Sequence, residues 1–257
     1  MLEGIRIIEL EGLGPGPFAA MMLADLGADV IVVHRPSLSV PSIPEQNIID
    51  RGKRSIILDL KNNDDLANMK KLIATANGII EGFRPGVMEA LGLGPEILHK
   101  DHPSLVYGRM TGWGQNGPKA KDAGHDLNYI ALSGALWYAS SAGTPPFTPP
   151  TLAGDIGGGA LYLVAGILAG LLRAQSTGKG TVIDAAIVDG SAHMMNLLMS
   201  TQAAGLLSPN RGESFLDGPP WSRCYSCADN EWISVQCLEP KFYAVFIEKL
   251  DLKDDPD

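Results

Sequence analysis

The segment IRIIELEGLGPGPFAAMMLADLGADVIVV, residues 5–33, decides the fold class of the chain. Residues 5–10 and 29–33 are short aliphatic runs of the kind found in buried strands, and residues 18–26 are expected to form a helix. A turn rich in glycine and proline, residues 12–17, separates the first strand from this helix. The order strand, helix, strand predicts neighbouring parallel strands.

The same alternation continues along the chain. Further strands are expected at residues 55–60, 78–81, 105–110 and 181–186, with helical segments between them. Repeated strand–helix units of this kind are typical of a sheet covered by helices. We therefore predict an α/β fold built on a parallel sheet.

Two glycine-rich turns suggest nucleotide binding, but neither has the complete motif. The turn at residues 12–17 would need a glycine in place of Pro17 to match the dinucleotide-binding pattern GxGxxG. Lys179 is followed by Gly180 instead of Ser or Thr, and the upstream glycine of a phosphate-binding loop is missing. We therefore expect neither a nicotinamide or flavin cofactor nor a nucleoside triphosphate.

The composition narrows the possible functions. The chain has 257 residues, 45% of them hydrophobic and 19% charged, which suits a globular protein with a sizeable core. The net charge of -9 argues against general nucleic-acid binding. Three cysteines do not suggest a disulfide framework, and Cys224 and Cys227 have no further ligands in sequence to complete a zinc site. We expect no metal and a reducing compartment.

Residues 156–172 form an uncharged run of 17 residues. As a helix this run would be about 25 Å long, which is short for a membrane core of about 30 Å. Its several glycines suit close packing against a sheet, so we interpret it as a buried helix. The N-terminus shows no secretory signal pattern. No membrane association is expected.

The best candidates for chemistry are His125 and Asp155. Histidine can accept and return a proton near neutral pH. Asp155 precedes three glycines and the apolar run, so we expect it to be the N-cap of that helix. Taken singly, a histidine is more often structural and an aspartate before a helix is more often only a cap.

Basic residues follow several of the expected strands. Arg35 follows the second strand, Arg84 follows the fourth, and residues 51–54 around the third carry three more positive charges. Ligands of open α/β sheets bind at the carboxyl ends of strands. These residues are either a seat for phosphate groups or solvated surface charge, and their spacing leaves both interpretations open.

The chain resembles the class III CoA-transferase (CaiB/BaiF) superfamily and, within it, the α-methylacyl-CoA racemase branch. The resemblance runs over essentially the whole chain and depends on many matches in one order. The matching stretches are residues 14–18, 23–30, 81–87, 109–115, 124–129, 154–155, 184–190 and 239–240.

The resemblance implies a Rossmann-like large domain and a second, smaller α+β domain of which the chain holds only the beginning. We predict a large CoA-binding domain at 1–190, a helical linker at 191–220 and the start of the small domain at 221–257. Members of the family form interlocked homodimers and bind acyl-CoA thioesters. Racemases invert C2 of 2-methyl-branched acyl-CoA and need no metal or redox cofactor, since CoA is part of the substrate.

The resemblance also implies roles for individual residues. His125 and Asp155 correspond to the bases on the two faces of C2, and Glu239 to a carboxylate from the partner subunit that supports the histidine. The residues that it places along the CoA moiety are Arg35, Leu58, Asp59, Lys61, Arg84 and Tyr129.

The chemistry of a thioester explains why several groups are needed. One positioned base supplies roughly 10²–10⁴ in rate, so the enolate oxygen must be stabilised as well. If a helix begins just after His125, the backbone N–H of Asp126 is a candidate donor for this oxygen. To deliver a proton, Asp155 needs apolar surroundings that raise its pKa.

Two alternatives stay open. A CoA-transferase would use Asp155 as a nucleophile, although His125 favours the racemase because the transferases have no need of this base. Relatives continue well beyond residue 257, so the chain could also be a non-catalytic fragment that binds CoA. We expect the protein in the cytoplasm, or in peroxisomes or mitochondria if the source is eukaryotic.

Overall fold

The computed structural model describes residues 1–36 and 47–253. By its internal contacts the chain divides into two compact units. The first unit consists of Met1–Ala135 and Pro149–Met194, and the second of Leu136–Thr148 and the segment that begins at Met195. Each unit is described by itself below.

A six-stranded sheet forms the centre of the first unit, and all of its neighbouring strands are parallel. The strand order is β3-β2-β1-β4-β5-β6. This arrangement confirms the predicted α/β fold with a Rossmann-like parallel sheet. The strands are β1 (Arg6–Leu10), β2 (Asp29–His34), β3 (Lys53–Ile57), β4 (Gly78–Glu81), β5 (Val106–Thr111) and β6 (Thr181–Ala186).

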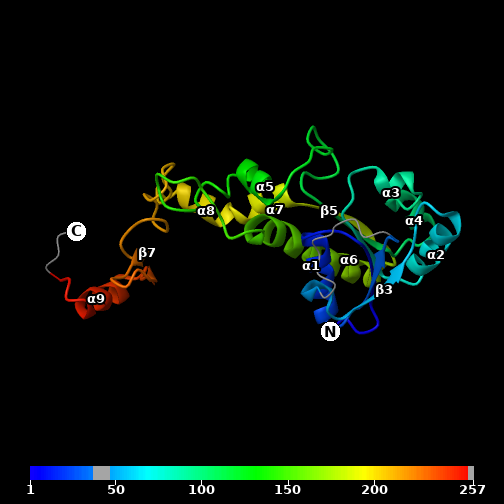
Figure 1. Cartoon of the computed structure of the whole chain (residues 1–257), viewed down its shortest axis with the longest axis horizontal. Coiled ribbons are helices and arrows are strands. Elements are labelled where there is room, and N and C mark those ends of the chain that lie inside the picture. Colours follow the sequence, from blue (N-terminus) through cyan, green and yellow to red (C-terminus); the bar gives the residue numbers. More distant parts are fainter. Residues whose placement is uncertain (37–46, 254–257) are drawn as a thin grey trace. The chain divides into compact units, whose positions relative to one another are not determined.

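Helices cover both faces of this sheet (Figure 1). A 3₁₀ turn, Ile48–Asp50, precedes β3, and the π-helical segment Leu152–Ala160 precedes α6. The helices are α1 (Pro15–Asp25), α2 (Asn63–Ile73), α3 (Val87–Ala90), α4 (Pro95–Asp101), α5 (Asp126–Ser133), α6 (Leu161–Thr177) and α7 (Ile187–Met194).

Alternating side chains of the strands build two separate cores. Ile7 packs with residues of α1 and α6 on one face, and the next residue, Ile8, packs with residues of α2, α3 and α4 on the other. Val106 and Tyr107 divide in the same way on β5. Strands buried on both faces have nearly continuous aliphatic sequences, which is why residues 5–10 and 29–33 lack a polar face.

Helix α6 is buried against the sheet. Residues 152–177 are long and apolar enough to span a membrane by length and composition. However, Leu163 and Ile167 are fully buried in the core of the unit. A Cβ atom on Gly108 of β5 would lie 2.8 Å from Leu163 Cδ1, so this glycine allows the helix to approach the strand closely. These contacts agree with the predicted core helix.

The segment before α6 corrects the prediction that Asp155 is a helix N-cap. Asp155 lies inside the π-helical turns of Leu152–Ala160, and these turns continue directly into α6. Close packing on α7 accompanies the wider winding, since a Cβ atom on Gly190 would lie 1.9 Å from the carbonyl oxygen of Gly158. The prediction was wrong because the helical winding already begins at Leu152, and the Asp155 N–H donates to Asp126, a tertiary contact that leaves no mark in the local sequence.

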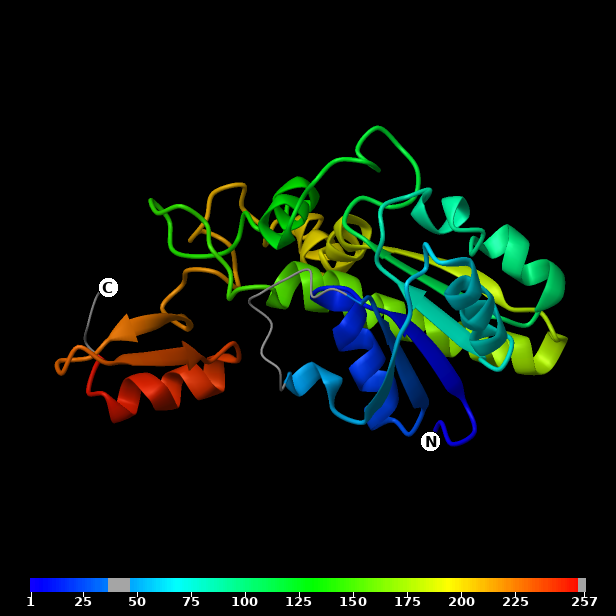
Figure 2. The ribbon, with the colours of Figure 1, turned by 45° about the vertical axis from the view of Figure 1, so that its right-hand side comes forward.

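The second unit contains α8 (Asn196–Gln202), the antiparallel strands β7 (Ser222–Ser226) and β8 (Trp232–Gln236), and α9 (Pro240–Lys249). Figure 2 shows α9 alongside the β7–β8 hairpin. Trp221 and Tyr243 meet edge to face within this unit, with ring centroids 5.7 Å apart. Residues 136–148, which the sequence assigned to the large domain, group with this unit, and the proposed domain boundaries stay a prediction.

Candidate active site

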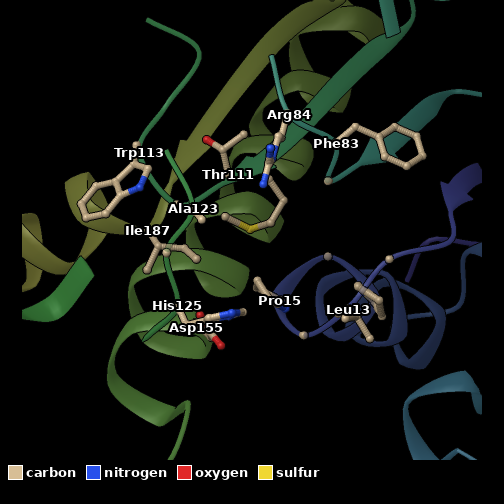
Figure 3. Close-up of a pocket in the computed structure, with 18 of the residues that line it drawn as sticks. Leu13, Pro15, Phe83, Arg84, Thr111, Trp113, Ala123, His125, Asp155 and Ile187 are labelled. Atoms are coloured by element: carbon tan, nitrogen blue, oxygen red, sulfur yellow. The ribbon is translucent and has the colours of Figure 1, made fainter. Parts of the chain in front are cut away.

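A cavity of about 510 Å³ opens in the first unit at the carboxyl ends of its strands (Figure 3). It lies where the strand order reverses between β1 and β4, which is the usual ligand site of open α/β sheets. Its walls come from four loop regions together with parts of α1, α5 and the π-helical segment. These regions are residues 10–17, 82–85, 110–113 and 122–125.

His125 reaches this cavity from the start of α5. The helix begins at Asp126, so His125 occupies the N-cap position, which meets the condition set for an Asp126 N–H donor. Its backbone is extended, and its N–H donates to the side-chain oxygen of Asn128 over 3.0 Å. This bond ties the histidine backbone to the first turn of the helix, and the imidazole lines the cavity.

Asp155 enters the same cavity from the π-helical segment, and Figure 3 shows its side chain next to that of His125. Burial and, to a smaller extent, the charge of Asp126 raise the pKa of Asp155 while nearby His125 lowers it, and the net result is a pKa of about 6. This carboxyl group therefore exchanges a proton close to neutral pH. The structure thus brings together the two groups that the sequence singled out.

Asp126 is buried and connects the two elements that carry His125 and Asp155. Its Oδ1 atom accepts hydrogen bonds from the backbone N–H groups of Gly154 and Asp155, over 2.9 and 2.8 Å. The backbone N–H of Asp126 belongs to the first turn of α5, whose N–H groups have no acceptor within the helix.

Tyr129 forms part of the cavity wall, together with residues 122–125. Its hydroxyl donates to the carbonyl oxygen of Gly124, and its ring meets Trp113 edge to face at 4.7 Å between centroids. Gly112 is required beside it, because a Cβ atom there would lie 2.1 Å from the tyrosine ring. Burial raises the pKa of Tyr129, with a smaller effect from the charge of Asp155.

Positive charge reaches the cavity through Arg35 and Arg84. The backbone N–H of Arg35 donates to Glu11 Oε2 over 2.9 Å, which links the ends of β2 and β1. The side chain of Arg35 is 49% exposed and therefore available to a ligand. Both arginines lie at the carboxyl ends of strands, as expected, and their place on the cavity wall favours the phosphate-binding interpretation over plain surface charge.

The structure does not bring the other predicted CoA-contacting residues to this cavity. Leu58 is buried in the core beside α2. Asp59 and Lys61 are in the turn before α2, where the N–H of Lys61 donates to Asp59 Oδ1 over 3.0 Å. Glu239 lies in the second unit, at the N-cap position of α9. Their proposed roles stay predictions.

Sequence reasoning missed several walls of the cavity. Met110, Trp113 and Ile187 line it, as does the turn Gly14–Pro15 at the start of α1. The sequence offered one usable signal, because each of these lies at or just after the carboxyl end of a strand. The turn was considered as a dinucleotide motif and as part of the family resemblance, and neither consideration gave it a place at the ligand.

Metal ligands are not grouped anywhere in residues 1–36 and 47–253. Cys224, Cys227 and Cys237 all lie in the second unit as free thiols. The cavity itself combines one imidazole, carboxyl groups and two guanidinium groups. Such a set suits proton transfer on an anionic ligand.

The model of CoA-transferase family III matches residues 2–257. The chain belongs to CoA-transferase family III. The crystal structure of a CAIB/BAIF family protein from Brucella suis superimposes with a TM-score of 0.82 at 27% identity, over 98% of this chain and 70% of that protein. A second crystal structure, that of Rv3272 from M. tuberculosis, has a TM-score of 0.80 at 30% identity, over 99% of this chain and 69% of that protein.

Two curated family III relatives bear the name alpha-methylacyl-CoA racemase. The mouse protein is 43% identical and the human protein 44% identical, each over 99% of this chain. Human succinyl-CoA:glutarate CoA-transferase is 32% identical over 79% of this chain. The chain spans 66% of the length of the two racemases.

Proposed function

We propose that the protein is an isomerase that inverts C2 of 2-methyl-branched acyl-CoA thioesters by removing and returning a proton. The observation that carries this proposal is the pair His125 and Asp155 in one cavity, with a pKa of about 6 for the carboxyl group. Similarity to the mouse and human racemases supports it.

Inversion needs two groups that alternate between base and acid. When one of them removes the C2 proton, an enolate forms, and the other returns a proton to the opposite face. A carboxyl group with a pKa near 6 suits both roles, because neither its charged nor its neutral form is strongly disfavoured at neutral pH. The imidazole of His125 is the natural counterpart.

The enolate oxygen requires hydrogen-bond donors. The first N–H groups of α5 lie directly after His125, so the Asp126 N–H is our candidate for this role. One such donor is worth about 10²–10³ in rate. Arg35 and Arg84 would neutralise phosphate groups of the CoA moiety.

Deuterium wash-in at C2 of a 2-methylacyl-CoA in heavy water tests the proposal. The protein should exchange the C2 proton and lose this activity in a His125→Ala variant. Equal, background-level exchange by both proteins would refute the proposal. Exchange that persists at the original rate in His125→Ala would refute the assigned role of the histidine.

A CoA-transferase is the second candidate, because Asp155 is a possible nucleophile and several relatives are named as transferases. In that reaction the carboxylate attacks the thioester, and an acyl-aspartyl intermediate forms as CoA leaves. Hydroxylamine would trap this intermediate at Asp155. The proton-transfer mechanism forms no covalent adduct, so hydroxylamine would leave the protein unmodified.

We further propose that the active protein is a cytoplasmic homodimer, in which Glu239 of one subunit supports the histidine of the other.

A third possibility is a chain that binds CoA without turnover, since it spans 66% of its racemase relatives. Sedimentation analysis with and without CoA, run beside the exchange assay, separates these cases.

A further inference from the structure

The carboxylate of Asp126 stands out among the buried polar groups of the first unit. It is 7% exposed, although it follows the exposed residue His125 directly. Its Oδ1 atom accepts two backbone N–H groups of the π-helical segment, which is 28 residues away in sequence. A charge is not normally buried unless it is compensated by several hydrogen bonds, so this placement calls for a specific reason.

The second observation is the shape of the chain around this carboxylate. A Cβ atom on Gly154 would lie 2.5 Å from Asp126 Oδ1 and 2.9 Å from Ile130 Cγ2. Only glycine therefore lets the π-helical backbone come close enough for both hydrogen bonds. The contact therefore depends on two residues, the buried acceptor Asp126 on α5 and Gly154, which has no side chain, opposite it.

We propose that the Asp126 carboxylate is a positioning group, which fixes the backbone of Asp155 relative to His125 and places a negative charge beside the Asp155 carboxyl group. This inference rests on the proposed racemase function for its kinetic consequences. The positioning itself can be measured without turnover. The side chain of Asp126 thus acts on the base opposite His125.

The charge has a predictable direction. A negative charge next to a carboxyl group disfavours the ionised form, so Asp126 keeps Asp155 a weaker acid than it would otherwise be. The other titratable groups facing Asp155 are His125 and Tyr129, both from α5. From α7 the π-helical glycines meet Ile187, Ser191 and Met194, and from the turn before α1 Asp155 meets Gly14. The charged side chains elsewhere on the cavity wall are Glu11, Arg35, Arg84 and Asp122.

Two substitutions separate the geometric effect from the charge effect. Asp126→Asn keeps an oxygen that accepts both N–H groups but removes the charge. Asp126→Ala removes both. We expect Asp126→Asn to retain most of the maximal exchange rate, whereas Asp126→Ala should lose about 10²-fold because Asp155 is no longer held in place.

The pH profile tests the charge effect. The acidic and basic limbs of exchange belong to the His125–Asp155 pair together. In Asp126→Asn the acidic limb should move to lower pH by about one unit, since the like charge is gone. An unchanged profile would overturn the electrostatic half of the proposal, because a merely structural role of Asp126 would not move it.

Amide hydrogen exchange tests the positioning half even if no variant turns over. The Gly154 and Asp155 amides should exchange slowly in the natural protein, at least tenfold faster in Asp126→Ala, and slowly again in Asp126→Asn. Equal protection in all three proteins would overturn the positioning role. Failure of the racemase proposal would show differently, as absent C2 exchange with the amide pattern intact.

A matched control is Asp217, whose two carboxylate oxygens accept the backbone N–H groups of Gly212 and Ser214 in the second unit. Asp217→Asn should leave both the pH profile and the protection of the Gly154 and Asp155 amides unchanged. If Asp217→Asn shifted the pH profile as much as Asp126→Asn does, the loss of any carboxylate would have this effect, and the proposal would be overturned.

Discussion

Arg109 on β5 donates through Nε to Glu81 Oε1 on β4 over 3.0 Å, and the two side chains are only 9% and 2% exposed. The other oxygen of Glu81 accepts the backbone N–H of Phe83 over 2.8 Å. Arg109 also bonds Glu89 of α3. This buried pair therefore anchors the loop, residues 82–85, that carries Arg84 into the cavity.

Replacing Arg109 by Met should destabilise the fold by about 3–5 kcal/mol, because Glu81 would stay buried without its partner. Urea unfolding would measure the loss. As a control, Arg54→Met removes an arginine that pairs with Asp29 while 63% exposed, and should cost less than about 1 kcal/mol. Equal losses in the two variants would contradict the structural role of the buried pair.

Gly154→Ala should reduce the exchange rate by about 10²-fold, because a methyl group would push the π-helical turn away from Asp126 and displace Asp155. Gly170→Ala is the control. Gly170 is equally crowded, with a Cβ 2.7 Å from Val106 Cγ1, but its neighbours are Val106 and Thr181 instead of Asp126. Both variants should unfold at lower temperature, and only the first should lose activity. Full activity in Gly154→Ala would rule out the tight contact.

Asp155→Asn should make the protein more stable at pH 8 while abolishing exchange. The pKa of Asp155 rises from 3.8 to about 6 on folding. The folded chain therefore binds more protons between these values, and the contribution of this group to stability falls as the pH rises through them. Because solvent screens the partly exposed group, we expect a gain of about 1 kcal/mol at pH 8.

The gain should disappear near pH 4, because the side chain at position 155 is then neutral in both folded proteins. Thermal unfolding of both proteins at pH 4, 6 and 8 would measure this trend. A difference that is the same at all three pH values would show that the substitution acts through packing instead of charge.

Arg84→Ala should weaken CoA binding by about tenfold, equivalent to about 1.4 kcal/mol, because one charged hydrogen-bond donor to phosphate is lost. Calorimetric titration with CoA would measure it. Lys61→Ala should have a smaller effect, since Lys61 does not line the cavity. Arg173→Ala, on the exposed side of α6, is the neutral control. Unaltered affinity in Arg84→Ala would remove this residue from the binding site.

The parallel sheet could be predicted from the order of apolar segments alone. Residues 5–33 contain a complete strand–helix–strand unit, and strands buried on both faces are recognisable because their few polar residues do not line up on one face. The helix that begins after His125 was also expected, although only as a condition for the oxyanion donor. These features are local, so a short window of sequence contains their cause.

The geometry of the site could not be read from the same windows. Asp155 was taken for a helix cap, because an aspartate beside glycines looks like one. The contact that decides its position comes from Asp126, 29 residues earlier in the chain. Residues 58–61 were expected at the ligand, yet Leu58 packs into the core beside α2. For Asp155 the determining partner is distant in sequence, and for Leu58 it is the packing of a whole core cluster.

By itself the sequence determined the α/β class and the two residues, His125 and Asp155, that carry the proposed chemistry. Periodicity and residue type express these properties one segment at a time. Tertiary structure alone decided that the chain around Asp155 winds as a π-helix, that Asp126 holds it, and that a buried Glu81–Arg109 pair supports the Arg84 loop. The reason is physical, because the pKa of a carboxyl group and the hydrogen bonds of a buried backbone depend on whichever neighbours the fold brings to them.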